Sequence, residues 1–113
     1  SKAPRLNIVI ICEGQTEANY LKMVTQKLRL PTITIENSNG HAPITMVKNA
    51  ITLGKQRPGI DYIYCTFDRD EHKSYEDAID KIKACKQKKL KIFAITSTPC
   101  FEIWILLHFV YST

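Results

Sequence analysis

The apolar positions along this chain follow two spacings, and each spacing predicts a different kind of element. Continuous or strictly alternating apolar runs, which are typical of strands, cover residues 7–12, 32–36, 61–67 and 90–95. Apolar residues three or four positions apart, which are typical of helices, follow at residues 16–28, 44–55, 74–85 and from residue 98 onward. This alternation predicts an α/β fold of three layers (α/β/α), with a mainly parallel four-stranded sheet between the helices.

Local signals predict where three of the helices begin. Thr16 is expected to cap the first helix, and Ser74 the third, with Asp77 in the position where a capping box usually has Glu. Thr98 and Pro99 open the last helix, which is apolar nearly all round and must therefore be covered by another part of the protein. The inward positions expected on the first helix are Tyr20, Leu21, Val24 and Leu28.

The length of 113 residues predicts a single domain over residues 1–113. The sequence stops just after the apolar helix, so we expect a C-terminal part of this domain to be missing. The longest apolar stretch, residues 101–111, is too short for a bilayer, which needs about 20 residues, and no membrane association is expected.

Cysteine usage and charge narrow the class of protein. Cys12, Cys65, Cys85 and Cys100 form no CxxC pair, which argues against a zinc ribbon or a thioredoxin-type site. Free thiols fit a reducing cytoplasm. The net charge of +5 and the pI of about 9.1 fit a polyanionic partner such as nucleic acid, and they fit a solvated lysine face equally well.

Acidic residues follow two of the predicted strands directly. Glu13 comes after the first strand, and Asp68 and Asp70 come after the third. In a sheet of order 2-1-3-4 these strands are neighbours, and the switch point where open α/β sheets bind ligands lies between them. The three carboxylates would then converge, and Mg²⁺ would relieve their repulsion while leaving positions open for a phosphate oxygen and a water.

Each candidate also has an ordinary structural explanation. Glu13 could belong to a simple strand-to-helix turn. Glu17, one turn beyond Glu13, is a candidate for a catalytic role beside the metal, or it is an acid that favours the first turn of a helix. Glu102, the only acid in the last helix, has the same explanation, although its apolar setting favours an inward role. His72 is either a proton shuttle or substrate contact, or a plain loop histidine.

Three motifs make the chain similar to the RloB-like family. Residues 10–17 (IICEGQTE), followed by Tyr20, resemble the opening motif of that family. Residues 67–72 (FDRDEH) resemble its second motif, and residues 97–104 (STPCFEIW), followed by 106–109 (LLHF), resemble its third. Together the motifs cover both ends and the middle of the chain.

The resemblance implies a Toprim-like catalytic core and a role in bacterial or archaeal antiphage defence or abortive infection through nucleic-acid cleavage. It implies that Asp68 and Asp70 bind Mg²⁺, with Mn²⁺ as a substitute, and that Glu13 acts as general acid or base. It also implies an ATPase partner encoded near restriction–modification genes. Family members usually continue past the third motif.

Two other classes of function stay open at this point. A receiver-like phosphoacceptor domain also carries acids after strands one and three, but it needs a lysine after a fifth strand, which this chain lacks. A noncatalytic module could use the same edge only to bind nucleic acid or the ATPase. No Walker A loop and no GxGxxG sequence is present, which disfavours a phosphate-cradling nucleotide site.

Overall fold

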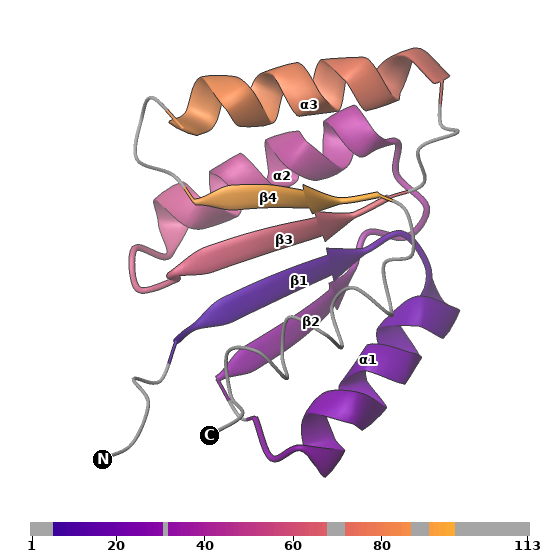
Figure 1. Cartoon of the computed structure of the whole chain (residues 1–113), viewed down its shortest axis with the longest axis vertical. Coiled ribbons are helices and arrows are strands. Elements are labelled where there is room, and N and C mark those ends of the chain that lie inside the picture. Colours follow the sequence, from indigo (N-terminus) through magenta and orange to yellow (C-terminus); the bar gives the residue numbers. More distant parts are fainter. Residues whose placement is uncertain (1–5, 31, 68–71, 87–90, 97–113) are drawn as a thin grey trace.

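Four parallel strands form one sheet in the order β2-β1-β3-β4, which confirms the predicted order (Figure 1). In this computed structural model, the residues whose placement is described are 6–30, 32–67, 72–86 and 91–96. The strands are β1 (Ile8–Cys12), β2 (Ile33–Asn37), β3 (Tyr62–Thr66) and β4 (Ile92–Ile95). The register pairs Ile8 of the central β1 with Ile33 and with Tyr62, so neighbouring strands end at the same edge.

Helices cover the two faces of this sheet unequally. The described helices are α1 (Gln15–Lys27), α2 (Pro43–Gln56) and α3 (His72–Lys86). Figure 1 shows α1 on one face and the packed pair α2 and α3 on the other. None of them is long and apolar enough to cross a membrane. The predicted last helix lies outside the described residues.

Burial explains why β1 forms the centre of the sheet. All five of its residues are buried, because their side chains alternate between an apolar cluster under α1 and another under α2 and α3. Ile10 and Cys12 pack on the α1 side, and Val9 and Ile11 pack on the other side. The edge strand β2 buries Ile33 and Ile35 and exposes the residue between them.

The structure corrects the predicted beginning and inner face of α1. The helix begins at Gln15 after Gly14, which makes no side-chain capping bond, so the predicted cap by Thr16 is wrong. Tyr20 is 42% exposed, because it lies about 100° around the helix from the buried Leu21. Leu28 is 40% exposed, although it is the C-cap of α1 and its N–H still donates to the carbonyl oxygen of Val24 at 3.0 Å.

Ser74 has a different role from the one its sequence pattern predicts. Because α3 begins at His72, Ser74 lies within its first turn and is not its cap. The Ser74 hydroxyl instead accepts a hydrogen bond of 2.9 Å from the backbone N–H of Ile44, in the first turn of α2. The N-cap of α2 is Ala42, which has no side-chain acceptor, so α3 supplies the one that α2 lacks.

Candidate functional site at the carboxyl edge of the sheet

The carboxyl ends of the strands meet at the edge where the sequence predicts the site (Figure 1). Glu13 follows β1, and Phe67, the residue before Asp68, follows the neighbouring β3. The backbone N–H of Phe67 donates to the carbonyl oxygen of Ile95 at 3.2 Å, so β3 stays paired with β4 up to this point. Helix α1 begins at the same edge, where its N-terminal dipole favours negative groups.

A hydrogen bond joins α1 to the end of β3. The Thr66 hydroxyl donates to Oε1 of Glu17 at 2.5 Å, and the carbonyl oxygen of Ile11 is a second, longer acceptor at 3.3 Å. Thr66 is fully buried, whereas Glu17 is half-buried. The carboxylate of Glu17 therefore lies between β1 and β3, at the switch point of strand order, and is bonded to Thr66, which precedes Asp68 by two residues in the chain.

The loop that follows β2 holds the backbone of Glu13. The carbonyl oxygen of Glu13 accepts hydrogen bonds from the N–H of Gly40 at 2.7 Å and from the Ser38 hydroxyl at 3.4 Å. The N–H of Ser38 also donates to the carbonyl oxygen of Cys12 at 2.8 Å. Asn39 and Gly40 have positive φ angles of 59° and 77°, and this left-handed turn lets the loop fold back onto Glu13. Glu13 itself is half-buried.

A chain of amide side chains ties the same loop to α1. Nδ2 of Asn37 donates to Oε1 of Gln15 at 2.9 Å, and Nε2 of Gln15 donates to Oδ1 of Asn19 at 2.6 Å. Oδ1 of Asn37 accepts from the N–H of Asn39 at 2.8 Å, which stabilises the turn. Our sequence analysis missed these residues and Thr66. The run Asn37-Ser38-Asn39 could have been found, because it begins at the last residue of β2, at the edge where Glu13 follows β1.

The structure does not describe the side chains of the remaining predicted site residues. Asp68, Asp70 and Glu102 lie outside the described residues, so the three-carboxylate site stays a prediction. His72 is the first residue of α3, which starts at this edge, but its side chain lies outside the description. Within residues 6–30, 32–67, 72–86 and 91–96, no three Asp, Glu, His or Cys side chains could together hold a metal ion.

The groups described at this edge are carboxylate and carbonyl oxygens, which are the kind of ligand that a hard divalent cation takes. Glu17 brings a carboxylate to the end of β3, and Glu13 is fixed by its backbone at the end of β1. Hard divalent cations such as Mg²⁺ take carboxylate, carbonyl and water oxygens as ligands. Asp68 and Asp70, which follow Phe67 directly, would complete a donor set of this kind.

The described thiols do not belong to the chemistry of this edge. Cys12, Cys65 and Cys85 are buried, as expected for small apolar residues. Burial raises the pKa of the Cys65 thiol to about 12, because the thiolate would lose its hydration. Cys65 is therefore a thiol at neutral pH and not a nucleophile.

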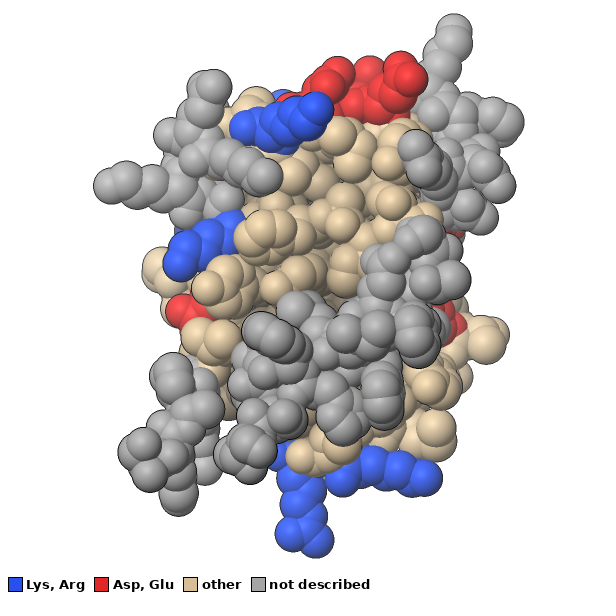
Figure 2. Space-filling view, in the orientation of Figure 1, with Lys and Arg blue, Asp and Glu red and all other residues tan. Residues whose placement is uncertain are grey.

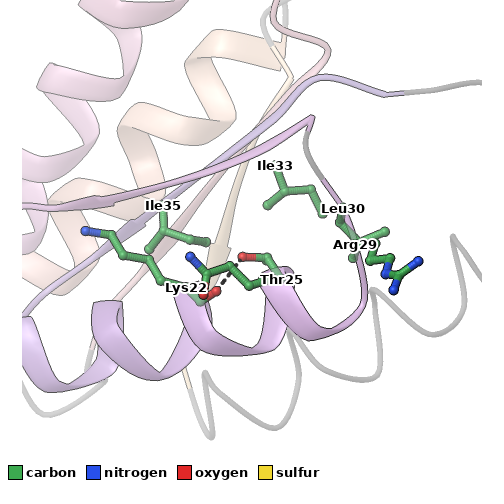
Figure 3. A pocket seen from close by; sticks show the side chains of 7 residues that line it. Lys22, Thr25, Arg29, Leu30, Ile33 and Ile35 are labelled. Atoms are coloured by element: carbon green, nitrogen blue, oxygen red, sulfur yellow. Dashed lines mark hydrogen bonds between the residues drawn. The ribbon is translucent and has the colours of Figure 1, made fainter.

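A hollow between α1 and β2 lies away from the predicted chemistry (Figure 3). It has a volume of about 550 Å³ between the C-terminal half of α1 and β2, and Lys22, Arg29 and Ile33 are among its lining residues. Within it, the Thr25 hydroxyl donates to the carbonyl oxygen of Lys22 at 3.0 Å. A smaller hollow of about 290 Å³ includes Asn37 and opens from the carboxyl edge toward α2. The smaller of these two hollows adjoins the candidate site.

The sequence has a basic run in and after α3, formed by Lys81, Lys83, Lys86, Lys88, Lys89 and Lys91, and this run fits either a solvated face or contact with a phosphate backbone. Lys81, Lys83 and Lys91 are exposed, and Lys88 and Lys89 lie outside the described residues. Figure 2 shows basic and acidic side chains together at the end of the molecule where α3 lies. The described lysines are consistent with a solvated face, and contact with a phosphate backbone stays a prediction.

Comparison with known proteins identifies one family. The family model described as RloB-like protein matches residues 8–113, which is nearly the whole chain. No curated protein and no solved structure gives a significant match. The matched range includes the three motifs on which the resemblance was based, at residues 10–17, 67–72 and 97–104.

Proposed function

This chain belongs to the RloB-like family, and we propose that it is a Mg²⁺-dependent nuclease of the Toprim type that acts in antiphage defence. The substrate would be DNA or RNA, and the reaction would be hydrolysis of a phosphodiester bond. The chain would work in the cytoplasm of a bacterium or archaeon, beside an ATPase partner. The positive net charge supports a nucleic-acid substrate.

The observation that carries this proposal is the meeting of α1 with the end of β3. Through the hydrogen bond from Thr66, the acid in the first turn of α1 lies where the segment with Asp68 and Asp70 begins. Since β1 and β3 are neighbours in the sheet, Glu13 follows the adjacent strand at the same edge. This arrangement supports the proposal that acids from both segments act on one phosphate group.

The roles of the residues follow from their chemistry. Asp68 and Asp70 would hold Mg²⁺, and Mn²⁺ in its place, and the bound ion would polarise the scissile phosphate. A water oxygen attacks phosphorus while the bond to the leaving oxygen breaks. Glu13 takes the proton from the water or gives one to the leaving oxygen.

Three further residues are proposed to assist. Glu17 would position α1 against β3, because its carboxylate accepts the Thr66 hydrogen bond. His72, at the start of α3, would contact the substrate or carry a proton. Glu102 would add an acid from the third motif.

A cleavage assay on the chain tests this function. Single- and double-stranded DNA and RNA would be incubated with Mg²⁺, with Mn²⁺ and with EDTA. We expect cleavage of at least one substrate with metal, and a loss of at least about 100-fold in Glu13→Gln and in Asp68→Asn. The matched control is Glu76→Gln, an exposed acid on α3, which should cleave like the parent. Equal activity in Asp68→Asn and the parent would refute the proposal.

Metal binding provides a second readout that separates a nuclease from a noncatalytic module. A ligand that binds the folded state raises its unfolding temperature. Mg²⁺ at millimolar concentration should therefore stabilise the parent and the Glu76→Gln control, but not the double variant Asp68→Asn/Asp70→Asn. Failure to cleave any of the four substrates, without a metal-dependent shift, would favour a module that only binds its partner.

A further inference from the structure

Strand β2 is at one edge of the sheet, and β1 is the strand that pairs with it among the described residues. The N–H of Ile8 donates to the carbonyl oxygen of Thr32 at 3.0 Å. In a regular parallel ladder, this bond directs the backbone groups of residues 32, 34 and 36 toward β1. The C=O of Ile33 and both backbone groups of Ile35 therefore face away from β1, and no described residue bonds them.

Hollows flank this edge on both faces of the sheet. On the α1 side, the hollow of about 550 Å³ has the buried side chains of Ile33 and Ile35 among its lining residues. On the opposite side, Glu36 lines the hollow of about 290 Å³, and Thr34 lines another of about 250 Å³. Successive side chains of a strand point to opposite faces, so both sets of side chains of an added strand would find space beside β2.

Basic side chains lie at both ends of the α1-side hollow. Lys22 and Arg29 are exposed and extend in opposite directions, with Ile33 and Ile35 between them (Figure 3). Their separation in sequence corresponds to about 10 Å along a helix, and strand residues four positions apart on one face are about 13 Å apart. The hollow therefore suits an apolar side chain that has one carboxylate two positions before it and another two positions after it.

Arg29 has a backbone conformation that glycine adopts more readily. Its φ angle is 54°, and its N–H donates to the carbonyl oxygen of Gln26 at 3.1 Å. The N–H of Leu30 donates to the carbonyl oxygen of Thr25 at 3.0 Å, which completes a Schellman motif at the end of α1. A side chain in this left-handed conformation costs about 1 kcal/mol. The sequence nevertheless has a cation here, at one end of the hollow.

We propose that an extended segment of a partner protein adds to the outer edge of β2 as a further strand, with an apolar side chain in the α1-side hollow and acidic side chains beside Lys22 and Arg29. In strand addition, main-chain hydrogen bonds give affinity and pockets for alternate side chains give specificity. The register of β2 is regular, and its sequence has no lysine or proline, residues that commonly protect an edge. The proposal does not depend on the nuclease function.

The charge and the backbone of this edge favour an acidic peptide over two other occupants. An antiparallel pair of β2 strands from two copies would place both α1 helices on one face, where Lys22 and Arg29 of each copy would repel those of the other. Nucleic acid offers phosphates to these cations, but it has no peptide groups to pair with the backbone of Ile35.

The experiment follows the backbone amide of Ile35 by NMR while a synthetic peptide is added to the chain. The peptide carries glutamate, threonine, valine, threonine and glutamate in that order, with acetyl and amide ends. One control peptide has lysine in place of glutamate, and another is N-methylated at the amides that would face β2. The double variant Lys22→Gln/Arg29→Gln tests the basic side chains. Its matched control is Lys27→Gln, because Lys27 is an exposed lysine of α1 that does not line the hollow.

We expect the glutamate peptide to shift the Ile35 amide resonance and to slow its hydrogen exchange. The double variant should bind this peptide about tenfold more weakly, and Lys27→Gln should bind it within about twofold of the parent. The lysine peptide and the N-methylated peptide should leave the Ile35 amide unchanged. The proposal is overturned if the glutamate peptide does not affect this amide, if the N-methylated peptide binds equally well, or if the double variant matches Lys27→Gln.

The other possible occupants of this edge give different results. An Ile35 amide that is as strongly protected as the paired amide of Ile10 in the free chain would show that the edge is already occupied, which overturns the proposal. A dimer in sedimentation whose formation protects Ile35 would assign the edge to a second copy and also overturn it. Displacement of the peptide by oligothymidylate at a lower concentration would assign the basic side chains to nucleic acid, with the same consequence.

Discussion

The Thr66 hydroxyl donates a hydrogen bond to the carboxylate of Glu17, and these two residues come from elements that are far apart in the chain. Glu17 lies in the first turn of α1, whereas Thr66 is the last residue of β3. The bond fixes the start of α1 against the strand from which the Asp68 segment continues. The packing of the start of α1 on this strand therefore includes a polar contact in addition to the apolar core.

Removing this contact should weaken the fold by a measurable amount. We expect Thr66→Val to lower the free energy of unfolding by about 1 kcal/mol, because it removes the donor to a half-exposed carboxylate without leaving a cavity. Urea denaturation of Thr66→Val, Glu17→Ala and the double variant gives the coupling between the two residues, expected at about 0.5–1 kcal/mol. Glu76→Ala combined with Thr66→Val is the control and should be additive. Additivity for Glu17→Ala would show that the hydrogen bond contributes nothing in solution.

The hydrogen bond between Ile44 and Ser74 predicts that α3 stabilises the start of α2. Ser74→Ala leaves the Ile44 N–H without its acceptor, and we expect the free energy of unfolding to fall by about 1 kcal/mol. The control is Thr52→Ala, which removes an exposed hydroxyl whose bond to the Lys48 carbonyl lies within α2. That change should be near neutral, because alanine has the higher helix propensity. If the two variants lose equal stability, Ser74 does not cap α2.

The turn that holds Glu13 gives a prediction with a matched pair of glycines. Gly40 has a φ of 77°, so Gly40→Ala forces a Cβ into a left-handed conformation and should cost about 1 kcal/mol of unfolding free energy. Gly59 has no positive φ and no atom within 4 Å of an added Cβ. Gly59→Ala should therefore be neutral or stabilising by about 0.5 kcal/mol. Thermal and urea unfolding check both values, and a neutral Gly40→Ala would contradict the strain argument.

The sequence was sufficient to predict the strands and their order in the sheet. Continuous apolar runs identified β1 and β3, and the lengths of the connections allowed only parallel pairing. The Asn-Gly turn and the polar loop after β2 could also be located, although their bonds to the Glu13 backbone depend on how two loops meet in space.

The contacts that sequence patterns missed are those between elements distant in the chain. Ser74 carries a capping pattern for its own helix, but its hydroxyl serves α2, thirty residues earlier. Thr66 reads as an ordinary β-branched strand residue, and only the packing of α1 on the sheet brings Glu17 to it. Local propensity determines where an element forms, whereas tertiary packing decides which side chain each hydroxyl reaches.

The buried thiol of Cys65 predicts a specific pH dependence of stability. Its pKa is raised to about 12 by burial, against 9.0 for an ordinary thiol, so the folded state keeps a proton that the unfolded state releases between these values. The free energy of unfolding contributed by this thiol is therefore fully present below pH 9 and is lost as the pH rises toward 12. Urea denaturation of the parent and of Cys65→Ala at pH 7, 9 and 10.5 measures the effect. At pH 7 the variant should be less stable by about 1 kcal/mol, because it leaves a small cavity. That difference should shrink above pH 9, and a constant difference across the series would contradict the buried, protonated state of Cys65.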